Sequence, residues 1–404
     1  MNFLLKAFQF YHIERLTNFK RFKILYTFIW IISFIFAREV QSYPSFIGYG
    51  YTSCIVCHFN ALGNGPLTDY GRALGATAIA AKPFYSPKAD DQKLGDQAMF
   101  LLGVVPLPDI LRLQANYRGM TYTTGIGNSP NTRFINMQID GSAILKVAED
   151  KLIAVINGGF VPQREGAETK LKPISREHYV SYAVTPRLRI YGGLLDPAYG
   201  IRIADHTAYS RTVNKVAQND QVHGIMAHLG TNKSEFAVHG FFGNLFQDSK
   251  ITPKGLSATF ETDVAEKVRI GSSALFSVSS VRKRILTALH SRAGIGKGSS
   301  LLLETGFVFD TEKDAKTLAK QYIYTQSMTR LFRGFHFLFT GEYYTADAFR
   351  PNPRSFRVGP SIQYFPTSFL ELRVDLWGER ALGQAGTFDP PDAFQLLGQV
   401  HAWF

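Results

Sequence analysis

The six residues from Ser53 to His58, which read SCIVCH, carry the most distinctive chemistry of this sequence. They hold both cysteines of the 404 residues, Cys54 and Cys57, and a histidine directly behind them. Two thiols at this spacing can bond to the two vinyl groups of one haem, while the adjacent imidazole ligates its iron. The motif therefore predicts one covalent haem c held by Cys54 and Cys57, with His58 as the proximal iron ligand.

Three other meanings of a CxxC pair are alternatives at this point. A thioredoxin-like redox pair needs a βαβ context, which the neighbouring sequence lacks. A zinc site needs four ligands, so histidines would have to complete a set begun by the two cysteines. A structural disulfide within the motif is the third alternative.

No motif marks the second axial ligand of such a haem. Met99, in DQAMFLLG, is a methionine between the motif and the first predicted strand and is the distal candidate, unless it only packs a small helix. An iron without a sixth ligand is also compatible with the sequence. Arg72 either pairs with a haem propionate through a forked contact or lies on a solvated helix face. Four histidines on predicted polar strand faces are further distal candidates: His239, His290, His336 and His401.

Residues 43–105 are predicted to form a compact, mostly helical and loop segment around the motif. Glycine-rich loops surround the cysteines. A helix is predicted from Pro66 to about Ala80, because proline suits the first helical position and apolar residues then recur at helical spacing.

From about Pro106 the hydrophobic pattern changes to strict alternation. In residues 370–377 the aliphatic side chains alternate with Glu371, Arg373 and Asp375, which predicts a strand with one apolar and one polar face. About sixteen segments share this pattern: 108–121, 131–147, 151–161, 177–184, 186–195, 221–229, 233–244, 255–264, 266–278, 281–294, 297–309, 317–330, 333–345, 355–364, 367–377 and 392–404.

Two architectures fit alternating strands. In a soluble sandwich the apolar faces pack inward, whereas in an outer-membrane barrel they face lipid and short turns alternate with long loops. Short and long links alternate here except near Ser279, the number of segments is even, and the final segment ends on Phe404. These features favour an all-β fold, a transmembrane antiparallel β-barrel of about 16 strands over residues 106–404, with residues 43–105 as a small haem c plug.

Residues 1–42 resemble a secretory signal peptide. A basic lead-in precedes an uncharged apolar run from Ile24 to Ala37. A retained N-terminal anchor helix is the alternative. Export would place the motif outside the cytoplasm, where haem is attached to CxxCH. The net charge is +12, but no dense run of Lys and Arg follows the leader, so the sequence does not indicate a nucleic-acid partner.

The order of these parts resembles the fused monohaem cytochrome–porins of the bacterial outer membrane, which include iron-oxidising outer-membrane cytochromes. Locally, the residues PSF, CIVCH and GPLTDYGRAL are similar to the haem segment of that family. The resemblance implies a bacterial outer-membrane protein whose haem segment faces the lumen or the periplasm. It also implies that Cys54, Cys57 and His58 hold the haem, and it assigns no distal ligand.

The function that follows is electron transfer between an extracellular donor or acceptor, with Fe(II) as one candidate, and a periplasmic cytochrome or other carrier. Such a protein is an electron carrier, with Fe(II) oxidation as its only candidate activity, rather than a hydrolase or transferase. The alternative is a diffusion porin whose haem-bearing plug acts as a gate, with lumenal arginines favouring anionic solutes. A haem peroxidase would need an open iron position and a distal acid–base residue, and no motif identifies one.

Overall fold

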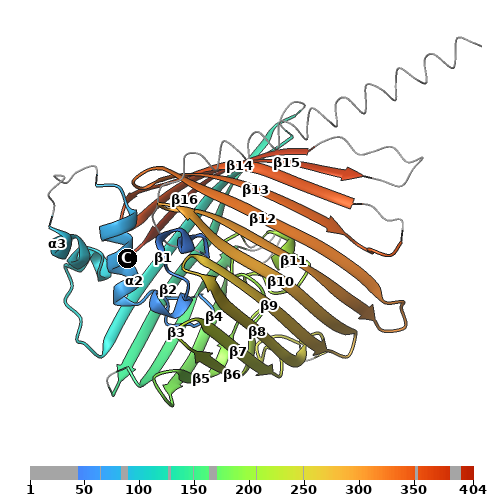
Figure 1. The fold of residues 1–404 in the computed structure, drawn as a ribbon, viewed down its shortest axis with the longest axis horizontal. Coiled ribbons are helices and arrows are strands. Elements are labelled where there is room, and N and C mark those ends of the chain that lie inside the picture. The colour runs from blue at the N-terminus through green and yellow to red at the C-terminus, as the bar shows by residue number, and fades with distance from the viewer. Residues whose placement is uncertain are drawn as a thin grey trace, which may run out of the picture.

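The protein is a closed barrel of sixteen antiparallel strands (Figure 1). This computed structural model describes residues 44–404 except 64, 83–89, 126–128, 149, 163–170, 206, 249, 351–353 and 383–392. Each strand pairs with its neighbours in sequence, and β1 closes the barrel by pairing with β16, where Asn116 lies opposite Trp403. The predicted signal peptide, residues 1–42, lies outside the described residues.

The sixteen strands correspond one to one with the sixteen alternating segments, so the barrel prediction is confirmed. Every described strand pair is antiparallel, as a barrel built from sequential hairpins requires. The strands are β1 (Leu111–Thr124), β2 (Asn131–Val147), β3 (Leu152–Pro162), β4 (Leu171–Ala183), β5 (Leu188–Leu195), β6 (Val222–Gly230), β7 (Ser234–Phe241), β8 (Lys254–Ala265), β9 (Val268–Val278), β10 (Arg282–Gly296), β11 (Ser299–Glu312), β12 (Leu318–Phe332), β13 (Phe335–Thr345), β14 (Arg354–Thr367), β15 (Leu370–Leu382) and β16 (Ala393–Trp403).

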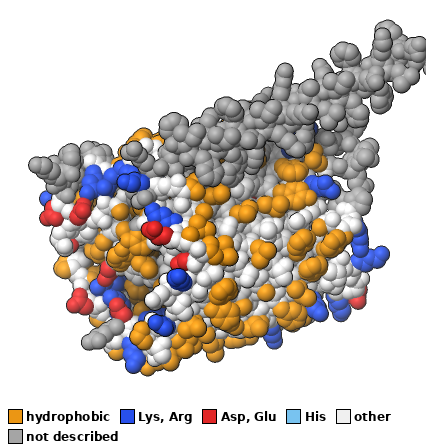
Figure 2. Space-filling view, viewed as in Figure 1, with side chains coloured by type: hydrophobic (Ala, Val, Ile, Leu, Met, Phe, Trp, Pro, Cys, Tyr) orange, Lys and Arg blue, Asp and Glu red, His pale blue; other side chains and the backbone are white. Residues whose placement is uncertain are grey.

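The apolar strand faces point outward. On β15, Val374 and Leu376 are 48% and 42% exposed, whereas Glu371 and Asp375 on the opposite face are 5% and 1% exposed. Figure 2 shows hydrophobic side chains spread across the outer surface of the strands. A soluble sandwich would bury these aliphatic residues and expose the acids, so the sandwich alternative is wrong and the barrel surface suits lipid.

The two ends of the barrel differ. Seven links of two to four residues, such as 148–151 and 333–334, gather at one end, which is called the short-turn end below. The other end carries most of the long links, including 196–221 and 242–253, and the link 279–281 is short as expected. No helix in the described part of the chain is long and apolar enough to span a membrane.

The segment before the barrel is made of several short helices, where loops and about one helix were predicted. They are η1 (Pro44–Tyr49), η2 (Cys54–Val56), α2 (Asp69–Leu74), the π-helical turn η3 (Gly75–Ile79), α3 (Asp91–Asp96) and η4 (Phe100–Gly103). The predicted start of the main helix at Pro66 is wrong. Thr68 caps the helix instead, accepting a 3.1 Å hydrogen bond from the Gly71 N–H on its hydroxyl, so helical structure begins at Asp69.

Residues 44–81, which we call the plug, sit inside the short-turn end of the barrel. Residues of η1 pack against β10 and β11, so closely that a Cβ on Gly48 would lie 2.7 Å from the Ser299 carbonyl oxygen. At the other end of the plug, the Ala81 N–H donates a 2.8 Å hydrogen bond to the Phe365 carbonyl of β14. The plug therefore contacts widely separated strands of the wall.

The link 196–221, which we call the lumenal loop, folds into the barrel from the opposite end and contains α4 (Tyr209–Thr212). Its backbone N–H groups bond to lumen-facing side chains of the wall. Ala198 donates to Ser257 of β8 at 3.0 Å, Gly200 to Ser273 of β9 at 3.0 Å, and Ile201 to Glu304 of β11 at 2.6 Å. The loop is thus fixed along the inner wall rather than over the mouth.

Outward Leu376, at the middle of β15, provides a test of the membrane orientation. Replacing it with Arg should destabilise the barrel by about 2–4 kcal/mol, because a charge would then face the centre of the hydrocarbon layer. Unfolding in lipid vesicles by denaturant, read from heat-modifiable gel mobility, measures the change. Leu382→Arg, at the end of the same strand, is the matched control and should cost about 0–1 kcal/mol. Equal stability of the two variants would contradict the orientation.

Candidate functional site

The CxxCH motif forms one tight turn in the plug. The N–H groups of Cys57 and His58 both donate to the Cys54 carbonyl, at 3.1 and 3.0 Å. His58 then pairs with Leu67 in an isolated antiparallel bridge, which closes the loop between them. Gly63 in this loop has a φ of +81°, and a Cβ there would lie 2.9 Å from the Cys54 sulfur. Glycine is therefore needed both for the backbone conformation and for the space beside the thiol.

Side chains from four strands hold this turn in place. The contacts combine acids of β4, β7 and β8 with an amide of β1, so the motif is fixed from opposite parts of the wall. The hydrogen bonds run from Thr52 to Asp263 at 3.1 Å, from Ser53 to Glu235, from Asn60 to Glu177 at 2.9 Å, and from the Gln114 amide N–H to the Leu67 carbonyl at 2.6 Å.

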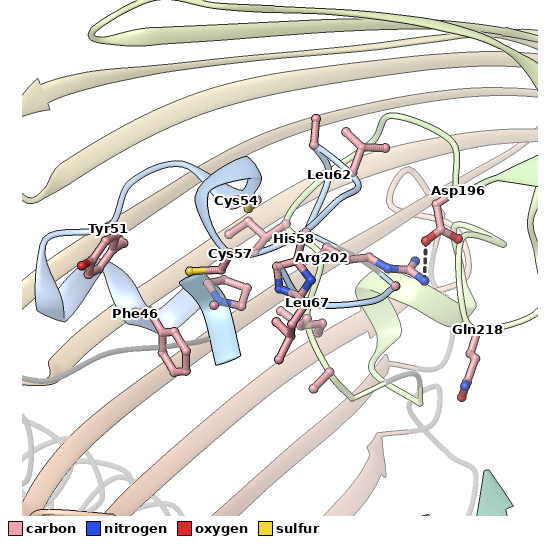
Figure 3. A pocket seen from close by; sticks show the side chains of 18 of the residues that line it. Phe46, Tyr51, Cys54, Cys57, His58, Leu62, Leu67, Asp196, Arg202 and Gln218 are labelled. Carbon is pink, nitrogen blue, oxygen red and sulfur yellow. Dashed lines mark ion pairs between the residues drawn. The ribbon is translucent and has the colours of Figure 1, made fainter. Parts of the chain in front are cut away.

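The two cysteines and the histidine line one cavity between the plug and the lumenal loop (Figure 3). Its volume of about 370 Å³ lies in the range of small-molecule sites. In Figure 3 the His58 ring lies between Leu67 and Arg202, and the Cys57 sulfur lies on the side of Phe46. The walls are apolar in large part. They include Phe46, Leu67, Ile79, Ile201, Ile203, Phe365 and Trp403.

The cysteine environment does not suit a thiolate. Burial raises the pKa of the Cys57 thiol to about 11, with a smaller contribution from Cys54. Burial also raises the pKa of Cys54, which outweighs the opposing effect of the Arg292 guanidinium. Reactive and zinc-binding thiols sit where the thiolate is favoured, and the described residues contain no cluster of three metal-binding side chains. The two thiols are separate and not joined as a disulfide.

Arg72 is buried rather than solvated, so the alternative that placed it on a wet helix face is wrong. It lines the cavity and is 5% exposed. Its guanidinium donates to the Ala98 carbonyl at 2.9 Å and to the main-chain oxygen of Phe404 at 2.7 Å. Arg72 thereby fastens α2 to the last residue of the barrel chain, and its pairing with a propionate stays a prediction.

The lumenal loop supplies the opposite wall of the cavity. Arg202 reaches into it and forms a 2.6 Å ion pair with buried Asp196, while Ile201 and Ile203 flank that arginine (Figure 3). Sequence reasoning treated residues 196–220 only as a long link. Its length was the available signal, because links beyond about 15 residues in a compact fold commonly carry function.

The structure separates the predicted axial ligands. Met99 does not line the cavity but precedes η4, outside the plug, so the distal role predicted for it gains no support from its position. His239, His290 and His336 are buried in the wall and do not line the cavity either. His401 does line it, and so does His228 of β6, which sequence reasoning missed although it also falls on a lumen-facing position.

A second cavity of about 300 Å³ lies farther along the β1–β2 and β14–β16 side of the lumen. It shares Arg118, Ala204 and His401 with the first cavity, so the two meet at these residues. Its other walls include Met120, Met137, Asp205, Arg373 and Trp377. The two cavities therefore adjoin each other within the lumen.

Five of the six lumenal arginines considered for anion selectivity are paired with acids, and the sixth, Arg118, lies 3.2 Å from His401 Nδ1. Arg357 lies 2.5 Å from Glu342, and Arg373 lies 2.7 Å from Asp375. The remaining pairs are Arg112 with Asp69, Arg282 with Asp310 and Glu312, and Arg284 with Asp310. Such pairs hold the wall together and leave little unbalanced positive charge for solutes.

Solved structures of outer-membrane proteins resemble about three quarters of this chain. OmpT of Vibrio cholerae superposes with a TM-score of 0.58 at 7% identity, covering 74% of this chain and 100% of that one. The anion-selective porin from Comamonas acidovorans gives 0.54 at 7% identity, covering 73% and 99%. The channel DcaP of Acinetobacter baumannii gives 0.53 at 10% identity, covering 73% and 97%.

The chain has the fold of outer-membrane porins. At these identities the likeness shows the fold alone, and the fold supports a place in the outer membrane. About a quarter of this chain has no counterpart in those porins, which are themselves covered almost completely. No family model matches the sequence, and no curated protein matches it.

The residues of the first cavity fit a covalent haem c. Two thiols and one imidazole come from a single turn and line the same space, which is the donor set that this attachment requires. Gly75 lines it with nothing within 4 Å of where a Cβ would lie, so a flat group can approach the backbone there. The apolar walls suit a macrocycle, and Arg72, Arg118 and Arg202 suit its propionates.

Arg72 and Arg112 allow a paired test of how the plug is held, since both tie α2 to the wall. Arg72→Met should loosen the plug markedly, because buried charge-assisted hydrogen bonds contribute about 1.5–3 kcal/mol each. Arg112→Met, whose partner Asp69 is 37% exposed, should cost at most about 1 kcal/mol. Limited proteolysis of the folded barrel measures this as faster cleavage between residues 44 and 105. Equal cleavage of both variants would contradict the anchoring role of Arg72.

Proposed function

We propose that this protein transfers electrons at the bacterial outer membrane through one covalent haem c carried inside a porin-like barrel. A single observation carries the proposal: Cys54, Cys57 and His58 of one CxxCH turn line one cavity within the lumen. A pore built only for diffusion has no need of two thiols and an imidazole at haem-attachment spacing beside a cavity of suitable size.

The chain's own residues have distinct parts in this proposal. Cys54 and Cys57 would hold the haem as thioethers, formed by adding their S–H groups across its two vinyl groups, and His58 would ligate its iron. The apolar wall from the plug and the lumenal loop lowers the dielectric around the site and limits water, which are two of the means by which a protein sets a haem potential. When bound, the haem supplies reversible one-electron transfer.

The position of the plug at the short-turn end indicates which partner exchanges electrons at each end of the barrel. Short turns of outer-membrane barrels face the periplasm, so the plug would open toward a periplasmic cytochrome or similar carrier. The lumenal loop lies between the plug and the long loops. One haem does not span a hydrocarbon core of roughly 30 Å, so the external donor or acceptor must approach within the barrel. Fe(II) is one candidate donor, on the family resemblance alone.

Replacing both Cys54 and Cys57 with Ser tests the cofactor directly. The variant should still fold as a heat-modifiable barrel but lose its covalent haem. The purified wild-type protein should show a c-type reduced spectrum and retain its haem in acid acetone. Release of haem from denatured wild-type protein, or equal haem retention by the double variant, would refute the attachment.

A diffusion porin with a plug is the second candidate function, and the fold likeness to porins is the observation that favours it. Planar-bilayer conductance separates the two. If the protein is an electron carrier, we expect only a small ionic current through it, because the plug and the lumenal loop occupy the lumen. Electron transfer also predicts that sealed vesicles carrying the wild-type protein pass electrons from an external donor to an enclosed acceptor. A large, stable current that the Cys54→Ser/Cys57→Ser variant keeps would favour the porin.

A further inference from the structure

Two side chains of the first cavity are candidates for the second axial ligand of the haem. Excluding His58, the nitrogen donors of imidazole type that line the first cavity among the described residues are His228 and His401. No methionine among the described residues lines the first cavity. The two histidines come from different regions of the wall, His228 from β6 and His401 from β16.

His401 has the hydrogen bonding of a metal ligand. Its Nδ1 lies 3.2 Å from a carboxylate oxygen of Glu371, on the paired strand β15. With the proton on Nδ1, this nitrogen donates to Glu371 and Arg118 is a charged neighbour rather than a donor to it, so Nε2 is left for the cavity. Metal-binding histidines commonly donate their second ring N–H to a carboxylate, which fixes the tautomer that leaves the other nitrogen as a ligand. The imidazole of His228, in contrast, has no hydrogen-bond partner among the described residues; its backbone pairs in the sheet.

The position of His401 also favours it. Ser53 and Thr52, just before Cys54, bond to β7 and β8, and His228 lies beside this wall, opposite Ala237 of β7. His401 belongs to β16, which pairs with β1, and β1 holds the His58 loop through the Gln114–Leu67 bonds. Trp403, 4.8 Å from the His401 ring between centroids, adds an apolar neighbour that lines the same cavity.

We propose that His401 is the second axial ligand of the haem and that Glu371 is its positioning residue. This inference rests on the proposed function, because it presumes a haem at Cys54, Cys57 and His58. Arg118 completes the arrangement: its guanidinium lies 3.2 Å from His401 Nδ1 and faces the same carboxylate, so the charge of Glu371 is balanced within the wall. His401 also borders the second cavity, so a redox partner there would lie next to a ligand of the iron.

Spectroscopy of purified full-length holoprotein tests the assignment. The wild-type ferric spectrum should be low-spin with the near-infrared signature of two imidazoles. His401→Ala should become high-spin and recover a low-spin spectrum when free imidazole is added, whereas His228→Ala and His336→Ala should keep the wild-type spectrum. His401→Met should replace the signature by that of one imidazole and one thioether. Glu371→Gln should keep the low-spin state but shift the near-infrared band, because a neutral amide polarises the imidazole less than a carboxylate.

The outcomes separate this inference from the function on which it rests. Haem that is covalently bound but high-spin in the wild type overturns the assignment, as does a His401→Ala variant that stays low-spin. A switch to high-spin in His228→Ala alone assigns the ligand to β6 and also overturns it. Absence of covalent haem from the wild type would instead refute the proposed function itself. Heat-modifiable mobility of each variant confirms that its barrel has folded.

Discussion

The structure depends on one constraint: a sheet in lipid must pair every backbone N–H and C=O group, and closing it into a barrel achieves this. Closure has a second consequence, because period-two alternation then sends every other side chain into the lumen. Those side chains are polar here, and many are buried. They are satisfied by ion pairs along the wall, such as Arg269 with Glu235, Glu261 and Asp263, or by the two inserts that enter the barrel. The plug and the lumenal loop are therefore required by the same chemistry that makes the wall.

The strands could be read from the sequence because their signal is local. Alternation needs only neighbouring residues, so β2 was predicted at its observed bounds and β15 at its observed face. The CxxCH motif was equally local. The errors arose where long-range contacts decide. Pro66 suits a helix start, yet Thr68 caps the helix. The turn at Cys57 and His58 places the Thr68 hydroxyl for this, and that hydroxyl also donates a 3.0 Å hydrogen bond to the Val56 carbonyl.

The rest of the site depends on the closure of the barrel, which no local pattern reports. His239, His290, His336 and His401 all occupy lumen-facing strand positions, and sequence alone gave no reason to choose among them. Only the register that places β16 beside β1 and β15 brings His401 to the cavity, next to Glu371 and Arg118. His228 is lumen-facing for the same reason. The role of the lumenal loop also stayed hidden, since its partners Ser257, Ser273 and Glu304 lie 59 to 103 residues away.

The pairing of charges in the lumen bears on which function the barrel can serve. An open porin selects solutes through unbalanced charge at its constriction. Here Arg357 of β14 and Arg373 of β15 lie at ion-pair distance from acids, and Arg202 of the lumenal loop is held by Asp196. Charges that are paired within the wall give a rigid surrounding. Electron transfer benefits from such a surrounding, because fixed dipoles do not have to reorganise when one charge moves. The paired wall is therefore compatible with the proposed electron transfer, while the fold likeness to porins favours diffusion.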